Sequence, residues 1–335
     1  MKRVQLFLVL VVALMLLPAS VFAGGQDEAA SSGKITVTFA GTEAATTTQS
    51  KMMQAVADVL NADGRFDAEV LVAGALSGDT DALVTQAKLG VPLVVPSDPG
   101  RLASQFNIPD MNILMAPYIL TDPAVLEKLP DTELFKTWSS QLEKQGIVLI
   151  ADMYNGFRNF YTVEKVEHVE DLSGMRIRGF GNDIGNALAK HFGFANIAIP
   201  FGEVFPAIQQ GALDGTEVQV SAAAGNAFWD VTPYIAITKH YMLQTAFVCS
   251  TRLLNGMPDD AREFFLKTIR EKALEYGKTG EEAEDGLYQK MADNGVTITE
   301  VDLKEFQDAI APLYKNNDLK FSPGLKEKLF DQLGM

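Results

Sequence analysis

Two arginines, one residue apart, stand out in an otherwise acidic chain. The stretch 171–181 reads DLSGMRIRGFG and places Arg176 and Arg178 on a short strand pattern that runs into a glycine turn. Because side chains alternate between the faces of a strand, both guanidinium groups are expected on one face. A guanidinium is planar, always charged, and able to hold a carboxylate through two parallel hydrogen bonds. The pair predicts an anion site if that face lines a cleft, and an ordinary surface feature if it faces solvent.

The two arginines differ in their position along the strand. Arg178 is followed directly by Gly-Phe-Gly, and the carboxyl ends of strands in α/β sheets border ligand crevices. Arg176 is expected in solvent or at the rim. Arg158, in YNGFRNFYT, is a second candidate because it also stands beside a glycine and aromatic residues. The alternative for each arginine is a surface ion pair, which contributes little to stability.

A glycine-rich segment, GFGNDIG at 179–185, follows the strand and opens a predicted helix. It is one residue longer than the dinucleotide-binding fingerprint, and the acidic residue roughly 20 positions on, Glu203, begins a helix instead of ending a strand. The sequence therefore does not favour a dinucleotide site. A helix start that presents its N–H groups to an anion is compatible with the same pattern.

The N-terminus has the pattern of an export signal. Lys2 and Arg3 precede an apolar run over 4–17, and the small residues before position 24 predict cleavage after Ala23. The run is shorter than the roughly 20 residues of a membrane span, and no cysteine follows the site to carry a lipid. We expect removal of residues 1–23, a disordered lead-in over 24–33, and a periplasmic location.

The charge and cysteine content of the chain limit the classes of partner and bond that we expect. The chain has a formal charge of −15 at pH 7, and loss of Lys2 and Arg3 leaves 26 basic against 43 acidic residues, or −17. Nucleic acids and anionic membranes are not expected as partners because both require a basic surface. The single cysteine, Cys249, cannot form an intramolecular disulfide. It stands in the apolar stretch TAFVCS, which predicts a buried thiol.

Residues for catalysis or metal binding are not apparent. The three histidines, His168, His191 and His240, lack the spacing of metal ligands. No Gly-x-Ser-x-Gly elbow or cysteine–histidine arrangement stands out. We therefore expect no metal, no cofactor and no enzymatic activity.

The order of predicted elements indicates an α/β protein. About 310 residues remain after cleavage, more than one core usually supports, so two domains are expected. Alternating strands and helices predict sheets covered by helices on both faces. A helical pattern of about 30 residues from Pro258 predicts a helix that braces both domains. Strands are expected at 34–40, 67–73, 92–95, 147–154, 157–163, 175–178 and 213–219, and further helices at 49–61, 80–89, 182–192 and 203–210.

The chain resembles the DctP-type solute receptors of tripartite ATP-independent periplasmic (TRAP) transporters. The resemblance rests on YNGFR (154–158), VEDLSGMRIR (169–178), IPFGEVFPAIQQGALDGTE (199–217) and FWDVTPYIAITKH (228–240). In the N-terminal half, AGTEA at 40–44, ALSGDTDAL at 75–83 and MAPYILTD at 115–122 also fit. The similarity spans nearly the whole chain that follows the predicted signal peptide.

The resemblance implies two α/β domains, with mixed sheets flanked by helices, that close on a ligand in the cleft between them. It places domain I at 34–155 plus 244–283 and domain II at 156–243 plus 284–335. The carboxylate-binding arginine of the family falls on Arg178, and a second pocket arginine falls on Arg158. Glu203, Asp214 and Glu217 are expected in structural roles, and His240 near the domain crossing.

The implied function is capture of a small organic anion, expected to be a carboxylate, and its delivery to integral-membrane TRAP subunits. The receptor is expected to act as a monomer and to catalyse nothing. Two alternatives keep the same fold and cleft: an exported enzyme, and a ligand-sensing partner of a signalling receptor.

One position departs from the family pattern. Many relatives carry an asparagine after the DGTE stretch, whereas this chain has Val218, with Gln219 next. Valine offers no hydrogen bond, so the expected ligand is less polar than a dicarboxylate or sialic acid. A monocarboxylate with an apolar body, resting against Val218, Phe180 or Trp229, would fit. The other interpretation of Trp229 and its neighbour Phe228 is helix packing.

Overall fold

The computed structural model describes residues 33–335. The predicted signal peptide and all but the last residue of the predicted lead-in therefore lie outside the described residues. Among the helices of the described part, none combines the length and apolarity that a membrane crossing would require.

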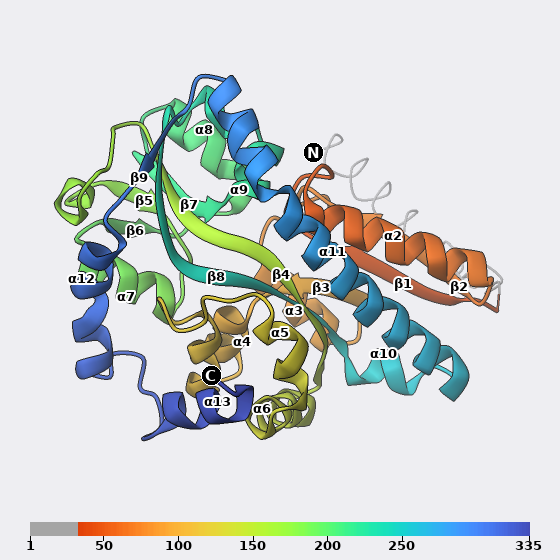
Figure 1. The fold of residues 1–335 in the computed structure, drawn as a ribbon. Coiled ribbons are helices and arrows are strands. Elements are labelled where there is room, and N and C mark those ends of the chain that lie inside the picture. Colours follow the sequence, from red (N-terminus) through yellow and green to blue (C-terminus); the bar gives the residue numbers. More distant parts are fainter. Residues whose placement is uncertain (1–32) are drawn as a thin grey trace, which may run out of the picture. The chain divides into compact units, whose positions relative to one another are not determined.

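One nine-stranded mixed sheet organises residues 35–335 (Figure 1). The strand order is β2-β1-β3-β8-β4-β7-β5-β6, and β9 adds to β8. The strands are β1 (Ile35–Ala40), β2 (Phe66–Leu71), β3 (Leu93–Ser97), β4 (Ile147–Thr162), β5 (Arg176–Arg178), β6 (Ala195–Ile197), β7 (Gly215–Gln219), β8 (Tyr234–Ser250) and β9 (Thr297–Glu300).

The sheet contains two groups of parallel strands joined by two long antiparallel ones. β1 pairs in parallel with β2 and β3, and β5 pairs in parallel with β6 and β7. Between the groups, β4 and β8 run antiparallel to each other, while β8 also pairs with β3 and β4 with β7. The prediction of a mixed α/β sheet flanked by helices is confirmed, and β4 and β8 are the crossing segments.

The sequence predicted two strands where β4 is one. The pairing of β4 with β8 shifts register between Tyr154 and Phe157, and Gly156 between them has a φ of 101°. A bulge bends a strand without ending it, and glycine accepts this backbone conformation without the strain other residues would meet. The break expected at Tyr-Asn-Gly is therefore a bend in a continuous strand.

The helices are α2 (Thr48–Asp63), α3 (Thr80–Lys88), α4 (Pro99–Gln105), α5 (Val125–Lys128), α6 (Glu133–Lys144), α7 (Asp183–Phe192), α8 (Val204–Gln209), α9 (Val220–Gly225), α10 (Thr251–Asn255), α11 (Asp259–Asp293), α12 (Leu303–Lys315) and α13 (Leu325–Leu333). Short 3₁₀ helices are η2 (Pro109–Met115), η3 (Leu129–Asp131), η4 (Val169–Leu172), η5 (Phe201–Glu203) and η6 (Phe228–Asp230).

Helix α11 is the long helix that the sequence predicted, and it has 35 residues. It lies along β4 and also packs against α2 and α9, elements that flank different groups of strands (Figure 1). Gly277 permits a close approach, because a Cβ there would stand 3.3 Å from the backbone nitrogen of Tyr154. The helix is therefore held directly against the crossing strand.

The apolar core has three clusters. One lies among β1, β2, β3, α2 and α11, and another among β7, α8, α9 and the C-terminal part of α11. The largest includes residues from both groups of strands, for example Leu93 and Ile177. Residues 35–335 form one compact unit, and the two-domain boundaries remain a prediction. Cys249 is fully buried, which confirms the prediction of a structural thiol.

Substitution of Gly185 tests how closely α7 packs against the end of β5. An added Cβ at Gly185 would stand 2.1 Å from the carbonyl oxygen of Phe180, a distance at which the backbone must move. We expect Gly185→Ala to lower the free energy of unfolding by about 2 kcal/mol or more, measured by urea titration. The control is Gly286→Ala in α11, where nothing lies within 4 Å and alanine should stabilise by about 0.5–1 kcal/mol. Equal effects of the two substitutions would contradict the close packing.

Candidate ligand-binding site

The carboxyl ends of two strands from each parallel group, β1 and β3 from one and β5 and β7 from the other, meet around one small cavity of roughly 60 Å³. Ligands in open α/β sheets bind outside these ends of the strands. The strand ends contribute Thr42 and Glu43 after β1, Ser97 of β3, Arg178 of β5, and Val218 and Gln219 of β7. A second cavity of roughly 280 Å³ continues from the first, because both are lined by Thr42, Thr80, Arg101, Arg178 and Phe201.

Three guanidinium groups surround the ring of Phe180 in this cavity. The guanidinium carbons of Arg158, Arg101 and Arg178 lie 4.3, 4.8 and 5.8 Å from the ring centre. Cations over an aromatic face are attracted to it, but they repel one another. How each charge is compensated therefore decides what the cavity can bind.

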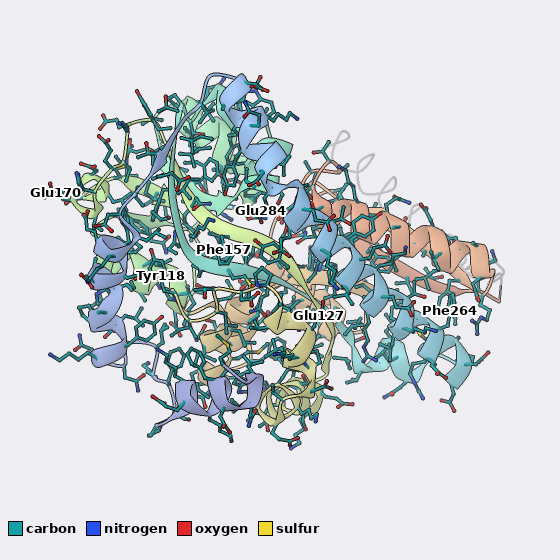
Figure 2. The ribbon with its side chains drawn as sticks, in the orientation of Figure 1. Tyr118, Glu127, Phe157, Glu170, Phe264 and Glu284 are labelled. Carbon is teal, nitrogen blue, oxygen red and sulfur yellow. The ribbon has the colours of Figure 1, made fainter. Side chains whose placement is uncertain are left out.

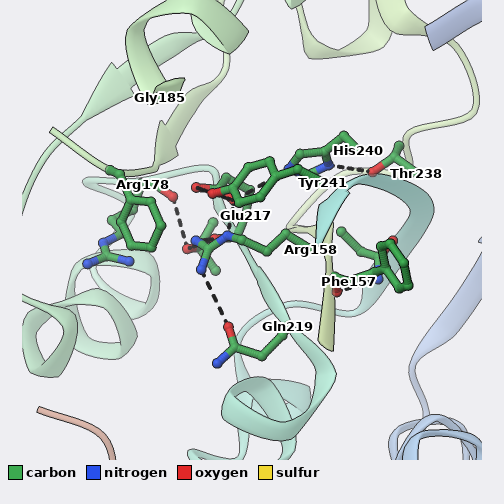
Figure 3. A network of polar contacts seen from close by, with 12 residues as sticks. Phe157, Arg158, Arg178, Gly185, Glu217, Gln219, Thr238, His240 and Tyr241 are labelled. Carbon is green, nitrogen blue, oxygen red and sulfur yellow. Dashed lines mark hydrogen bonds and ion pairs between the residues drawn. The ribbon is translucent and has the colours of Figure 1, made fainter. Parts of the chain in front are cut away.

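Arg158 is already neutralised inside the protein. It is 2% exposed, its Nε donates to the carboxylate of Glu217, and a second N–H donates to the Glu217 carbonyl oxygen (Figure 3). Its Nη1 donates to Oε1 of Gln219 at 3.4 Å. Burial opposes the charged form, but the charge of Glu217 outweighs it and raises the pKa of Arg158. The predicted second pocket arginine thus lines the cavity with its charge paired to Glu217.

Glu217 is held in place by two further residues (Figure 3). Nε2 of His240 lies 3.4 Å and the Tyr241 hydroxyl 3.3 Å from its Oε2, and Nδ1 of His240 lies 2.8 Å from the Thr238 hydroxyl. Burial works against ionisation of Glu217, but the charge of Arg158 and the His240 contact lower its pKa to about 2. Burial lowers the pKa of His240, so the neutral ring donates to Glu217 and accepts from Thr238.

Arg101 is the cavity arginine that sequence reasoning missed. Helix α4 begins at Pro99, and Asp98 caps it by accepting from the backbone nitrogen of Arg101 at 2.9 Å. The same carboxylate pairs with Nε of Arg101 at 2.9 Å, and Asp81 lies 3.6 Å from Nη1. An aspartate before a proline predicts a helix start. This signal was present in PSDPGR at 96–101.

Arg178 is the one cavity arginine without an acidic partner among residues 33–335. Its side chain is 5% exposed, its Nε donates to the carbonyl oxygen of Ile199 at 3.3 Å, and it lies 5.4 Å from the Phe201 ring. Burial, together with the charges of Arg158 and Arg101, lowers its pKa to about 9. Arg178 therefore remains a cation at neutral pH, buried and uncompensated.

Unpartnered polar atoms line the same cavity. Oε2 of Glu43, Oδ1 of Asn155 and Oγ of Ser97 are buried and lack hydrogen-bond partners among the described residues. The other oxygen of Glu43 accepts from Gln219 at 3.0 Å, and burial raises the pKa of Glu43. Buried polar atoms in folded proteins are normally hydrogen-bonded. Sequence patterns do not reveal this set, because its members come from β3, β4 and the segment after β1.

Arg176 and Trp229 lie apart from the cavity. Arg176 is exposed and pairs with Asp214 through two hydrogen bonds of 2.9 and 2.5 Å, which confirms its predicted place outside the site. Trp229 lines a separate hollow under Lys290 of α11, whose Nζ is 5.0 Å from the indole ring. Of the expected ligand contacts, Arg178, Arg158, Phe180 and Val218 are brought together. Trp229 does not line this cavity, and its indole lies beside α11.

The glycines of GFGNDIG serve close packing. A Cβ at Gly179 would stand 2.6 Å from Oδ1 of Asn196, and Gly185 touches the Phe180 carbonyl as described above. The side chain of Asn182 caps α7 by accepting from the nitrogen of Gly185 at 3.0 Å. These contacts account for the pattern without a nucleotide. No cluster of potential metal ligands occurs within the described part of the chain.

Comparison with known proteins agrees with this geometry. The model of the family described as bacterial extracellular solute-binding protein, family 7, matches residues 39–319. The C4-dicarboxylate-binding periplasmic protein of Rhodobacter capsulatus is 25% identical over 258 residues, which cover 75% of this chain and 76% of that protein.

Two solved structures are similar over most of the chain. A TRAP periplasmic solute-binding protein of Desulfovibrio salexigens, in complex with diglycerolphosphate, is 27% identical with a TM-score of 0.82, covering 90% of this chain and 97% of that one. One from Ochrobacterium anthropi, with bound L-fuconate, is 26% identical with a TM-score of 0.83, covering 90% and 99%. The chain therefore belongs to family 7 of the bacterial extracellular solute-binding proteins, the solute receptors of TRAP transporters.

Proposed function

We propose that this receptor captures a small hydroxylated organic acid, with Arg178 holding the anionic group. The observation that carries the proposal is the buried, unpaired charge of Arg178 at the end of β5. We further propose that residues 1–23 are a cleavable signal peptide, that the receptor is a monomer, and that it delivers its ligand to TRAP membrane subunits in the periplasm.

Because the guanidinium of Arg178 is unpaired, a bound ligand shifts the equilibrium between the open and closed conformations. An uncompensated buried charge costs on the order of 3–5 kcal/mol. A carboxylate in the cavity would cancel that cost through two charge-assisted hydrogen bonds. The ligand therefore stabilises the closed form more than an open form in which water reaches Arg178. Membrane subunits can then distinguish the loaded receptor from the empty one by its shape.

The size and walls of the cavity support a small ligand that carries hydrogen-bond donors. A volume of roughly 60 Å³ corresponds to several water-sized probes, so the inner cavity suits the acid group and one or two carbons. The buried acceptors of Glu43 and Asn155 favour hydroxyl groups beside the acid. Val218 and Phe180 form only part of the cavity wall, so apolar contact with the ligand is limited to that part. The L-fuconate bound to the O. anthropi protein has this chemistry.

The alternatives are less well supported. The named relatives are binding proteins and not enzymes. Glu217, the acidic residue in contact with Arg158, is committed to an internal ion pair. A sensing role would use the same ligand cleft.

Arg178→Ala should weaken ligand binding at least about 100-fold, because a buried charge-assisted pair is lost. The measurement is calorimetric titration with an acid identified by a thermal-shift screen of organic acids. The control, Arg176→Ala, should change affinity less than about 2-fold, since this exposed residue pairs only with Asp214 at the surface. Equal losses for both variants would refute the assignment.

The stabilities of the empty variants should separate the two buried arginines. Arg158→Met leaves the Glu217 carboxylate buried and unpaired, so the melting temperature should fall by several degrees. Arg178→Met removes a charge that has no acidic partner, so the melting temperature should stay the same or rise. A fall as large as that of Arg158→Met would show that Arg178 is compensated by another group.

Hydroxyl recognition by Glu43 predicts a preference between matched ligands. A 2-hydroxy acid should bind about 10-fold more tightly than the same acid without the hydroxyl, because its donor satisfies a buried acceptor. Glu43→Ala should reduce this preference to less than about 3-fold. Glu69→Ala, which alters an exposed acid on β2, should preserve it. If the wild type bound the unsubstituted acid more tightly, the result would indicate a ligand with an apolar body instead of hydroxyl groups. That result would leave the proposed role of Arg178 unchanged.

A further inference from the structure

A second groove lies between α5, α6 and α11, separate from the ligand cavity. It consists of two adjoining hollows of roughly 460 and 170 Å³, which share Leu126, Glu127, Asp152 and Leu274. Figure 2 shows Glu127 beside α11. Neither hollow shares a lining residue with the two cavities around Arg178. We call it the Asp152 groove.

The groove exists because one edge of β4 is open there. β4 pairs with β8 along its length, but β7 covers the other edge only over 158–162. Within the described residues, the stretch 147–157 has no strand on that side. Helices α6 and α11 flank it, and Arg270 of α11 donates its Nε to the carbonyl oxygen of Ile150 at 3.0 Å. An edge strand leaves backbone and side-chain groups accessible to a further molecule.

Asp152 stands where the two hollows meet. Both of its carboxylate oxygens are buried and lack a hydrogen-bond partner among the described residues. Burial alone raises its pKa to about 7. A buried carboxylate without a donor is unfavourable, and such groups in folded proteins call for a specific explanation. Asp152 is therefore the polar group that a ligand in the groove would satisfy.

The nearby cations are engaged elsewhere. Lys278 pairs with Glu127 at 2.7 Å, and Lys136 pairs with Glu133 at 3.2 Å. Arg270 contacts the backbone of β4. The acidic residues that line the groove, besides Asp152, are Asp122 and Glu127 near α5, Glu143 of α6 and Glu281 of α11. The groove is thus lined by more acidic than basic residues, and its buried acid, Asp152, has no ion-pair partner among the described residues.

The remaining walls are apolar, with Leu126, Phe135, Leu149 and Leu274 lining the larger hollow. Its volume falls in the range of roughly 300–1,000 Å³ that small-molecule sites occupy. Apolar walls around one buried acid match a molecule with a positive end and a hydrocarbon body. A neutral hydroxyl would donate a hydrogen bond to Asp152 but leave its charge uncompensated, and an anion would be repelled.

We propose that the Asp152 groove binds a small organic ammonium ion, with its N–H groups donating to Asp152 and its hydrocarbon chain against the leucines. The receptor thus has a cation site in addition to its anion site. Strand β4 contributes to both sites, because Arg158 lines the anion cavity and Asp152 lines the groove.

The test is calorimetric titration of the protein with pentylammonium, using 1-pentanol and hexanoate as neutral and anionic probes of similar shape. Pentylammonium should bind at least about 10-fold more tightly than pentanol, and hexanoate should not bind in the groove. Asp152→Asn should weaken pentylammonium binding at least 10-fold. The matched control, Asp122→Asn at the mouth, should change it less than 3-fold. Equal binding of pentanol, or an unchanged affinity in Asp152→Asn, would overturn the proposal.

Three further measurements separate loss of the site from loss of folding and from binding elsewhere. Asp152→Asn removes an unpaired acid, so the empty variant should melt no lower than the wild type at pH 8, which shows that it is folded. Affinity for pentylammonium should decrease as the pH is lowered from 8 to 5.5, because protonated Asp152 offers no charge. Arg178→Ala should retain pentylammonium binding. Loss of binding in that variant would place the amine in the anion cavity and refute a second site.

Discussion

The unpaired charge of Arg178 is the constraint on which the site depends. Three arginines surround Phe180, and two have acidic partners, Glu217 for Arg158 and Asp98 for Arg101. Only the third has its charge available for a guest. In a chain with a formal charge of −15, attraction of an anion has to be local, and low polarity around the cavity strengthens it.

The rest of the fold keeps that charge in place. The network of Glu217, His240 and Tyr241 fixes Arg158 under the Phe180 ring, and Phe180 in turn stands beside Arg178. Strands β4 and β8, with α11 along them, connect the two groups of parallel strands whose ends form the cavity (Figure 1). Movement of one group against the other would open and close the site, while the crossing elements keep the two groups aligned.

Arg178 and Asp152 are buried groups of opposite charge without an ion-pair partner among residues 33–335. Each is expected to reduce the stability of the empty protein, since burial without compensation disfavours a charge. Natural proteins keep such costly features where function requires them, and offset them elsewhere through packing. The extensive apolar core and the long strands β4 and β8 provide that offset.

The sequence by itself determined the features that depend on neighbouring residues or on family patterns. These were the α/β class, the long helix α11, the buried Cys249 and the exposed position of Arg176. Only the tertiary structure decided which charges are compensated. Asp98 neutralises Arg101, and Glu217 neutralises Arg158. Glu43 and Asn155, which both line the cavity, come from parts of the chain that are far apart in sequence. The place of Trp229 is likewise set by the tertiary structure, which puts its indole ring beside Lys290 of α11. Burial and pairing join residues far apart in the chain, and local spacing does not contain that information.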